Sequence, residues 1–138
     1  MTLKLSNIHI VLLAAGKSTR FKASENKLLS KLKDKTILEH NIEQLKKIGF
    51  KKITLVIRNN NILKNIKENN IELIKGGKTR TLSVKNALMK SKITARYVFI
   101  HDAARILTSE KILKKLIKET YKGKYDCIIP YSKCADTV

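Results

Sequence analysis

Short apolar runs recur along the chain, each with the length of a strand. The first covers residues 8–13 and is interrupted only by His9, a pattern typical of a strand buried on both faces of a parallel sheet. Similar runs, rich in β-branched residues, follow at 53–57, 71–74, 97–100 and 126–131. The pattern therefore predicts five strands, with 27–33 as a further short strand or an ordered coil.

Segments of helical periodicity separate these runs. Thr36 and Glu39 form a capping box at the start of a helix that ends at Gly49. Further helices are predicted within 59–70, at 80–89 with Thr79 or Thr81 near its start, and after Ser109. The helix at 80–89 is suggested by Leu82, Ala87, Leu88 and Met89.

Strands that alternate with helices predict right-handed βαβ units. The expected fold class is α/β: a mostly parallel, twisted sheet with helices on both faces, in a Rossmann-like three-layer sandwich. A chain of 138 residues is long enough for one core, so one domain is expected.

The chain is strongly basic, with 30 Lys and Arg against 11 Asp and Glu and a net charge of +19. Such a charge suggests either a polyanionic partner such as nucleic acid or a lysine-rich composition. The lysines are spread over every segment, and aromatic residues make up only 5% of the chain. Composition is therefore the preferred interpretation, and nucleic acid is not the expected partner, whereas a nucleotide-sized polyanion fits the charge.

Two cysteines, Cys127 and Cys134, have no neighbours at metal-ligand spacing, so a zinc site is not expected. Cys127 lies in an apolar run and is predicted to be buried. Free cysteines and the absence of a signal-peptide pattern in residues 1–7 favour the cytoplasm. No segment is apolar for long enough to cross a membrane, so no membrane association is expected.

The first apolar run ends in a loop of small residues followed by cations. A loop of this kind after a buried strand is suited to binding phosphates. Gly16, Lys17 and Ser18 match the end of a P-loop, but the earlier glycine of that motif would fall at Val11, inside the strand. No Rossmann glycine fingerprint is present either. A P-loop NTPase is therefore a weak alternative, and it would require ATP or GTP hydrolysis.

Four stretches in order support a more specific interpretation. They are the sequence LAAGKSTR at 13–20 with Lys27 behind it, GGKTRTLSV at 76–84, HDAAR at 101–105, and Asp136-Thr137. Together they resemble the 2-C-methyl-D-erythritol 4-phosphate cytidylyltransferases, nucleotidyltransferases of isoprenoid precursor synthesis. Three of the stretches follow strand ends, where open α/β sheets bind their ligands.

The resemblance implies the nucleotide site. CTP would be bound by the loop and the glycine turn, and Arg20 and Lys27 would be the catalytic cations that stabilise charge on the phosphates. Ser83 would contact the base. Arg80 would support the base and ribose pocket, although an ion pair near Asp102 is an equal alternative. The implied nucleotide-binding residues are Ala14, Ala15, Gly16, Lys17, Ser18, Gly76, Gly77, Arg80 and Ser83.

The resemblance also implies a metal and an acceptor. Asp102 would bind Mg²⁺, and Thr137 would contact the phosphorylated polyol. His101 is read as structural, because a phosphate oxyanion needs no base in order to attack. The expected reaction transfers CMP from CTP to 2-C-methyl-D-erythritol 4-phosphate and releases pyrophosphate. The alternatives are another alditol phosphate, such as ribitol 5-phosphate, and a basic nucleic-acid-binding module.

The chain departs from the family pattern in three places. Asn26 and Ile106 stand where proline is common, which affects loop stiffness more than charge. Family members also continue beyond the Asp-Thr motif, whereas this chain stops at Val138. We therefore expect residues 1–138 to be the N-terminal and central part of one nucleotidyltransferase domain, without the dimerisation arm and C-terminal part. The full-length form is expected to be a homodimer. This chain alone is expected to bind CTP without catalysing the transfer efficiently.

Overall fold

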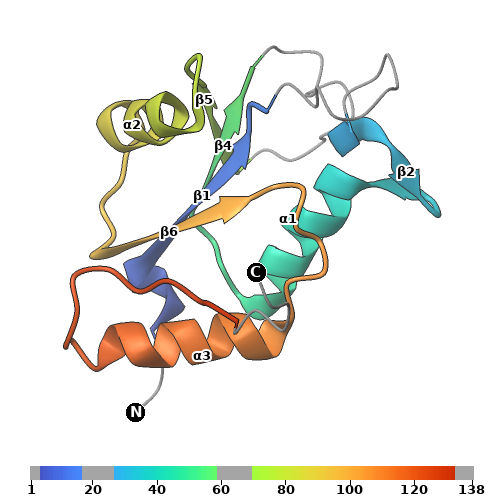
Figure 1. The fold of residues 1–138 in the computed structure, drawn as a ribbon. Helices are drawn as coiled ribbons and strands as arrows, with labels where there is room; N and C mark the ends of the chain where they lie inside the picture. Colours follow the sequence, from blue (N-terminus) through green and yellow to red (C-terminus); the bar gives the residue numbers. More distant parts are fainter. Residues whose placement is uncertain (1–3, 17–26, 59–69, 133–138) are drawn as a thin grey trace, which may run out of the picture. The chain divides into compact units, whose positions relative to one another are not determined.

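A four-stranded parallel sheet in the order β5-β4-β1-β6 forms the centre of the fold (Figure 1). The structure is a computed structural model, and it describes residues 4–16, 27–58 and 70–132. The four strands are β1 (Ile8–Ala14), β4 (Ile53–Ile57), β5 (Ile71–Lys75) and β6 (Tyr97–Asp102). The strands predicted at 8–13, 53–57, 71–74 and 97–100 are thus confirmed.

The register of the sheet aligns the carboxyl ends of its strands. Ala14 pairs with Ile57 of β4, and Ile57 pairs in turn with Lys75 of β5. On the other side of β1, Leu13 pairs with Asp102, the last residue of β6. Because all the pairings are parallel, the loops that leave these four strands begin at one edge of the sheet.

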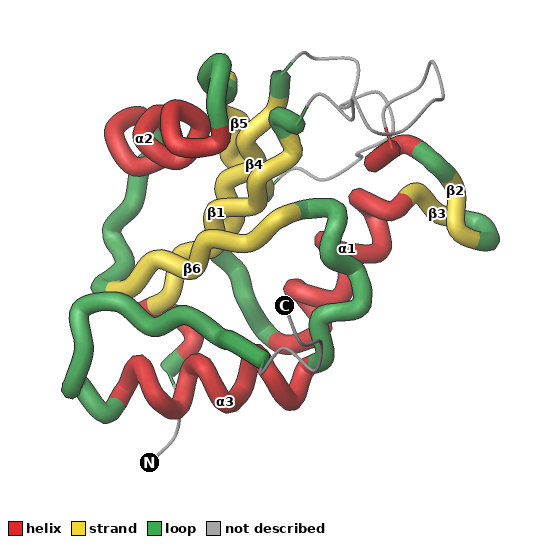
Figure 2. Tube along the Cα trace, viewed as in Figure 1, coloured by secondary structure: helices red, strands yellow, loops and turns green. Residues whose placement is uncertain are grey.

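Helices α1 (Ile37–Ile48) and α2 (Arg80–Lys90) lie on opposite sides of the sheet (Figures 1 and 2). This arrangement confirms the α/β fold class with helices on both faces. A short 3₁₀ turn, η1 (Leu5–Asn7), precedes β1. The fully buried core side chains include Ile10, Leu12, Leu38, Ile42, Leu45, Phe50, Leu55 and Val56.

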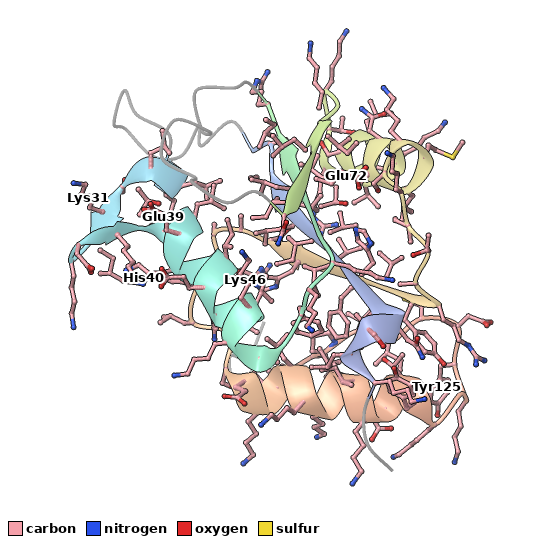
Figure 3. The ribbon with its side chains drawn as sticks, turned by 180° about the vertical axis from the view of Figure 1, so that it is seen from behind. Lys31, Glu39, His40, Lys46, Glu72 and Tyr125 are labelled. Atoms are coloured by element: carbon pink, nitrogen blue, oxygen red, sulfur yellow. The ribbon has the colours of Figure 1, made fainter. Side chains whose placement is uncertain are left out.

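Helix α1 has the predicted start and end. The Glu39 amide donates to Thr36 Oγ1 at 3.2 Å, and the Thr36 amide donates to Glu39 Oε2 at 2.7 Å, which completes the capping box (Glu39 is labelled in Figure 3). Gly49 ends the helix in the left-handed region, with φ of 109°. Before α1, the turn η2 (Lys27–Leu29) and a small antiparallel pair, β2 (Lys31–Leu32) with β3 (Lys35–Thr36), occupy the segment predicted as a strand or ordered coil.

Helix α2 forms as predicted, and small side chains make up its buried face. Thr79 caps it by accepting from the Leu82 amide. The buried residues are Ser83 and Ala87, whereas the other apolar residues named for this helix, Leu82, Leu88 and Met89, are exposed. Ser83 and Ala87 are four residues apart and therefore share one helix face. Two small side chains let a helix pack closely on a sheet, and the larger apolar residues consequently face away.

The remaining described residues, 107–132, form a second compact unit. Ser109 caps its helix α3 (Glu110–Tyr121), as predicted, by accepting from the Ile112 amide at 3.3 Å. The strand predicted at 126–131 is wrong: the segment has no regular structure, and Ile129 and Tyr131 are exposed. Cys127 is exposed as well, contrary to the prediction. An apolar run becomes a strand only where another strand offers hydrogen bonds, and this run has no strand partner among the described residues.

The helix predicted within 59–70 falls almost wholly on residues 59–69, outside the described residues. Among the helices that the structure describes, none has the length and apolar character needed to span a membrane.

Candidate active site

The loops after β1 and β5 touch at Ala15 and Gly76. A Cβ added to Gly76 would lie 2.5 Å from Cβ of Ala15, 2.9 Å from Oγ of Ser83 and 3.3 Å from Val56. Real Cβ atoms do not approach other carbons so closely, so the contact requires glycine at position 76. Two predicted loops and the first turn of α2 are therefore in van der Waals contact at the carboxyl edge.

Ser83 holds the glycine turn against α2. Its buried hydroxyl accepts from the Gly77 amide at 3.1 Å and donates to the Thr79 carbonyl at 2.9 Å. Gly77 is itself closely packed, since an added Cβ would lie 2.3 Å from Cβ of Leu82. Both bonds of the Ser83 hydroxyl stay within the turn, so in this structure Ser83 shapes the backbone of residues 76–79.

Asp102 lies between two arginines where β6 ends. Arg80 Nε donates to Oδ1 at 3.2 Å, and Arg105 Nε donates to Oδ2 at 3.0 Å. The side chains of Arg80 and Arg105 are largely exposed, and the Asp102 side chain is about half as exposed as that of Arg80, with 31% against 64%. The structure thus contains the ion pair that was the alternative role for Arg80. The part played by Arg105 was not identified from the sequence, although HDAAR contains it.

The loop after β6 is fixed from two sides. The Ala103 amide donates to the Leu13 carbonyl, and the Ala103 carbonyl accepts from Asn41 Nδ2, both at 3.0 Å. Asn41 is fully buried on α1. Sequence reasoning missed this residue. The signal was a polar residue on the apolar face of α1, three residues after Leu38 and four before Leu45.

The family model for "IspD: 2-C-methyl-D-erythritol 4-phosphate cytidylyltransferase" matches residues 8–138. The chain belongs to this cytidylyltransferase family. Its sequence is 40% identical over 136 residues to a bifunctional enzyme IspD/IspF from Pelagibacter ubique, covering 96% of this chain and 36% of that protein. The chain therefore spans about a third of the length of the curated relatives it matches.

Solved structures of the family have the same fold. The bifunctional IspDF of Campylobacter jejuni is 35% identical, with a TM-score of 0.83 over 95% of this chain and 34% of that one. The 2-C-methyl-D-erythritol 4-phosphate cytidylyltransferase of Francisella tularensis is 31% identical, with a TM-score of 0.68 over 83% of this chain and 52% of that one. These similarities support the α/β fold described above.

The loop after β1 is described only in part. Ala14 is buried, Ala15 is half-buried and Gly16 is exposed, and a Cβ on Gly16 would meet no described atom within 4 Å. The predicted residues Lys17, Ser18, Arg20 and Thr137 lie outside the described residues.

Lys27 is placed by the structure but is not joined to the other predicted site residues. It is the exposed first residue of η2, and its carbonyl accepts from the Ser30 amide at 3.2 Å. Within the described ranges, no hydrogen bond or ion pair connects Lys27 with Ala15, Gly76 or Asp102. Its predicted catalytic role therefore stays a prediction.

His101 precedes Asp102 on β6. Burial lowers the pKa of its imidazole, and Arg105 adds to this effect, while the Asp102 carboxylate opposes it. Since the pKa falls below the usual value of 6.5, the imidazole is neutral at pH 7. A neutral, half-buried imidazole is compatible with the structural role predicted for it.

Asp102 is the predicted metal-binding residue. Among the residues that the structure describes, no three His, Cys, Asp or Glu side chains cluster as a metal cage would require. A nucleotide-bound Mg²⁺ needs less, because phosphate oxygens and water supply most of its ligands and one or two carboxylates are enough. A single carboxylate at the strand ends fits that kind of metal.

Proposed function

We propose that this chain binds CTP and provides the transfer site of a Mg²⁺-dependent cytidylyltransferase. The enzyme moves CMP from CTP to 2-C-methyl-D-erythritol 4-phosphate and releases pyrophosphate. The observation that carries the proposal is the contact of Ala15 with Gly76 at the carboxyl edge, beside Asp102 in the sheet register. Membership of the cytidylyltransferase family supports the same reaction class.

The nucleotide would bind where the loops meet. The amides of residues 14–18 would receive the phosphates. The Gly76-Gly77 turn, held in shape by Ser83, would bring backbone groups to the base. Because a backbone edge offers donors and acceptors at fixed positions, it can distinguish cytosine from other bases.

In the transfer step, a phosphate oxygen of the acceptor attacks the α-phosphorus of CTP. The bond from that phosphorus to the oxygen shared with the β-phosphate breaks, and pyrophosphate leaves with the electron pair. The attacking oxygen is already an anion at neutral pH, so no general base is needed. Arg20 and Lys27 would stabilise the charge on the phosphates, and positioning supplies the rest of the catalysis.

Asp102 is the residue that would hold Mg²⁺. When bound, the ion would neutralise phosphate charge and orient the triphosphate. The backbone next to Asp102 is fixed through Ala103 to β1 and α1, which would hold the position of this ligand.

The acceptor is proposed from the family and from Thr137. A second candidate of the same class is ribitol 5-phosphate or another alditol phosphate. Pyrophosphate release by the full-length protein, measured with CTP and each acceptor, separates the two. We expect release with methylerythritol phosphate and little with ribitol 5-phosphate, and the reverse order would establish the second candidate.

Lys27 offers a matched test of the same reaction. Lys27→Ala should lower the rate of pyrophosphate release about 10²-fold or more, by analogy with the loss of an oxyanion donor. Lys31→Ala is the control, because Lys31 is an exposed lysine four residues later, on β2 (Figure 3). Equal rates in the two variants would remove Lys27 from the mechanism.

A nucleic-acid-binding module, suggested by the net charge of +19, predicts something different. It would bind duplex or single strands with a steep dependence on salt, and Arg20→Ala would leave that binding intact. Loss of CTP binding in Arg20→Ala, together with weak nucleic-acid affinity, would reject it.

The assembly is also part of the proposal. The curated relatives are named as bifunctional enzymes and are about three times as long as this chain. The chain would form the N-terminal and central part of one nucleotidyltransferase domain, working in the cytoplasm as part of a homodimer. Sedimentation of the full-length protein tests the dimer.

A further inference from the structure

Two guanidinium groups cover the carboxylate that the proposed function assigns to the metal. Arg80 takes Oδ1 and Arg105 takes Oδ2, so each oxygen of Asp102 accepts one charged hydrogen bond. Arg80 comes from the first turn of α2, whereas Arg105 follows Asp102 by three residues. The arginines place two positive charges beside one negative charge, and this arrangement repels a divalent cation.

Neither ion pair holds the Asp102 carboxylate strongly. The side chains of Arg80 and Arg105 are 64% and 73% exposed, so water and salt screen both pairs. Exposed pairs contribute little free energy and exchange partners easily. Guanidinium groups also bind phosphates well, because their planar donors match the spacing of two phosphate oxygens.

We propose that Arg80 and Arg105 occupy Asp102 in the nucleotide-free protein and exchange it for the anionic groups of the nucleotide. The carboxylate then binds the metal weakly in the nucleotide-free protein and more tightly when a nucleotide draws the arginines away. In this scheme, Arg80 and Arg105 are positioning residues that make metal and nucleotide binding cooperative. The inference rests on the proposed function, because it takes Asp102 as the metal-binding residue.

Cooperativity of this kind is reciprocal. If CTP raises the affinity for the metal by freeing Asp102, the metal must raise the affinity for CTP by the same factor. If one arginine is removed, one oxygen of Asp102 is already available to the metal, and CTP no longer has to displace that arginine. The nucleotide-free protein should then bind the metal more tightly, while the enhancement by CTP becomes smaller.

The test titrates the nucleotide-free chain with Mn²⁺, followed by the loss of the free-ion signal in electron paramagnetic resonance. Arg80→Ala and Arg105→Ala should each tighten Mn²⁺ binding about fivefold, as expected for loss of an exposed ion pair. Asp102→Asn should abolish the binding. Lys78→Ala is the control, because it removes the same charge from an exposed position two residues from Arg80 and leaves both bonds to Asp102 intact.

Each outcome decides the question. Tighter binding in the arginine variants but not in Lys78→Ala supports the exchange. Equal tightening in Lys78→Ala would show a general effect of net charge and overturn it. Unchanged Mn²⁺ affinity in both arginine variants, with loss in Asp102→Asn, overturns the exchange while Asp102 remains the metal ligand. If no protein binds Mn²⁺ at Asp102, the exchange fails together with the metal assignment, and CTP binding then tests the rest of the proposed function separately.

Discussion

Gly76 and Ala15 lie so close together that a Cβ on Gly76 would stand 2.5 Å from Cβ of Ala15. Gly76 follows β5 and Ala15 follows β1, and β4 separates these two strands in the sheet. The two loops therefore reach across the end of β4 to meet each other. Because of this contact, the loops after β1 and β5 form one continuous surface at the carboxyl edge of the sheet.

Replacement of Gly76 by alanine should separate the loops. An overpacked contact of this kind typically costs about 1–3 kcal/mol, so the free energy of unfolding of Gly76→Ala should fall by about that amount in urea titrations. Gly16→Ala serves as the control for stability, since its added Cβ would meet no described atom within 4 Å. Equal stabilities of the two variants would contradict the close contact.

Ser83→Ala should weaken CTP binding without breaking the helix. The variant loses the acceptor for the Gly77 amide and the donor to the Thr79 carbonyl, each worth about 1 kcal/mol, so the turn loses its fixed shape. We expect the dissociation constant for CTP to rise about tenfold. Ser91→Ala is the matched control, because Ser91 donates to the Ala87 carbonyl at the other end of the same helix. An equal effect in both variants would reduce the role of Ser83 to helix stability.

Asn41→Ala should loosen the loop that follows Asp102. The change removes the donor to the Ala103 carbonyl and leaves a buried acceptor unpaired, which costs about 1–3 kcal/mol. Glu43→Ala on the same helix removes only an exposed ion pair with Lys35 and should cost less than about 1 kcal/mol. Urea titration of both variants measures the difference, and the expectation fails if Glu43→Ala is the more destabilised of the two.

His9 makes the stability of the sheet depend on pH. Thr54 Oγ1 donates to Glu72 Oε2 at 3.0 Å, and His9 Nε2 lies 2.7 Å from the same hydroxyl, so Nε2 must be the donor to Thr54 (Glu72 is labelled in Figure 3). The other ring nitrogen, Nδ1, is buried and finds no partner among the described residues. Protonation would therefore place an unpaired N–H in the core.

The sign of the effect follows from the direction of the shift. Burial lowers the pKa of His9 from its usual 6.5, Lys52 adds to this, and Glu72 opposes it. Because the unfolded chain binds the proton more readily, stability is complete above pH 6.5 and is lost as the pH falls toward the folded-state pKa. His9→Gln should flatten the pH dependence of the unfolding free energy between about pH 5 and 7. The comparison is made in a His101→Asn background, because the His101 pKa is lowered too. An unchanged slope in His9→Gln would refute the assignment.

Local signals predicted the elements of the sheet well. The apolar runs gave four strands, and Thr36, Thr79 and Ser109 each cap the helix expected of them, because a cap depends on residues three positions apart. The run at 126–131 failed because strand pairing depends on a distant partner that an apolar pattern does not reveal. The apolar residues of α2 indicated the helix but not which of its side chains are buried, because the burial of Ser83 and the exposure of Leu82 depend on how the helix packs.

The candidate site was predicted as a set of loops but not as a set of contacts. The parallel order of the strands placed Gly76 and Asp102 at one edge, which the register confirms. The bond from Asn41 to Ala103 depends on packing between segments 62 residues apart, which residue spacing alone does not show. The pairing of Arg105 with Asp102 is local, but it depends on the shape of the turn after β6.

The most direct test of the central claim is calorimetric titration of this chain with CTP in the presence of Mg²⁺, beside ATP and beside Arg20→Ala. The account predicts selective binding of CTP, with loss of that binding in Arg20→Ala. The reason is that the Gly76-Gly77 turn would recognise the base and the Arg20 guanidinium would bind the phosphates. Equal binding of CTP and ATP, or CTP binding that survives unchanged in Arg20→Ala, would contradict it.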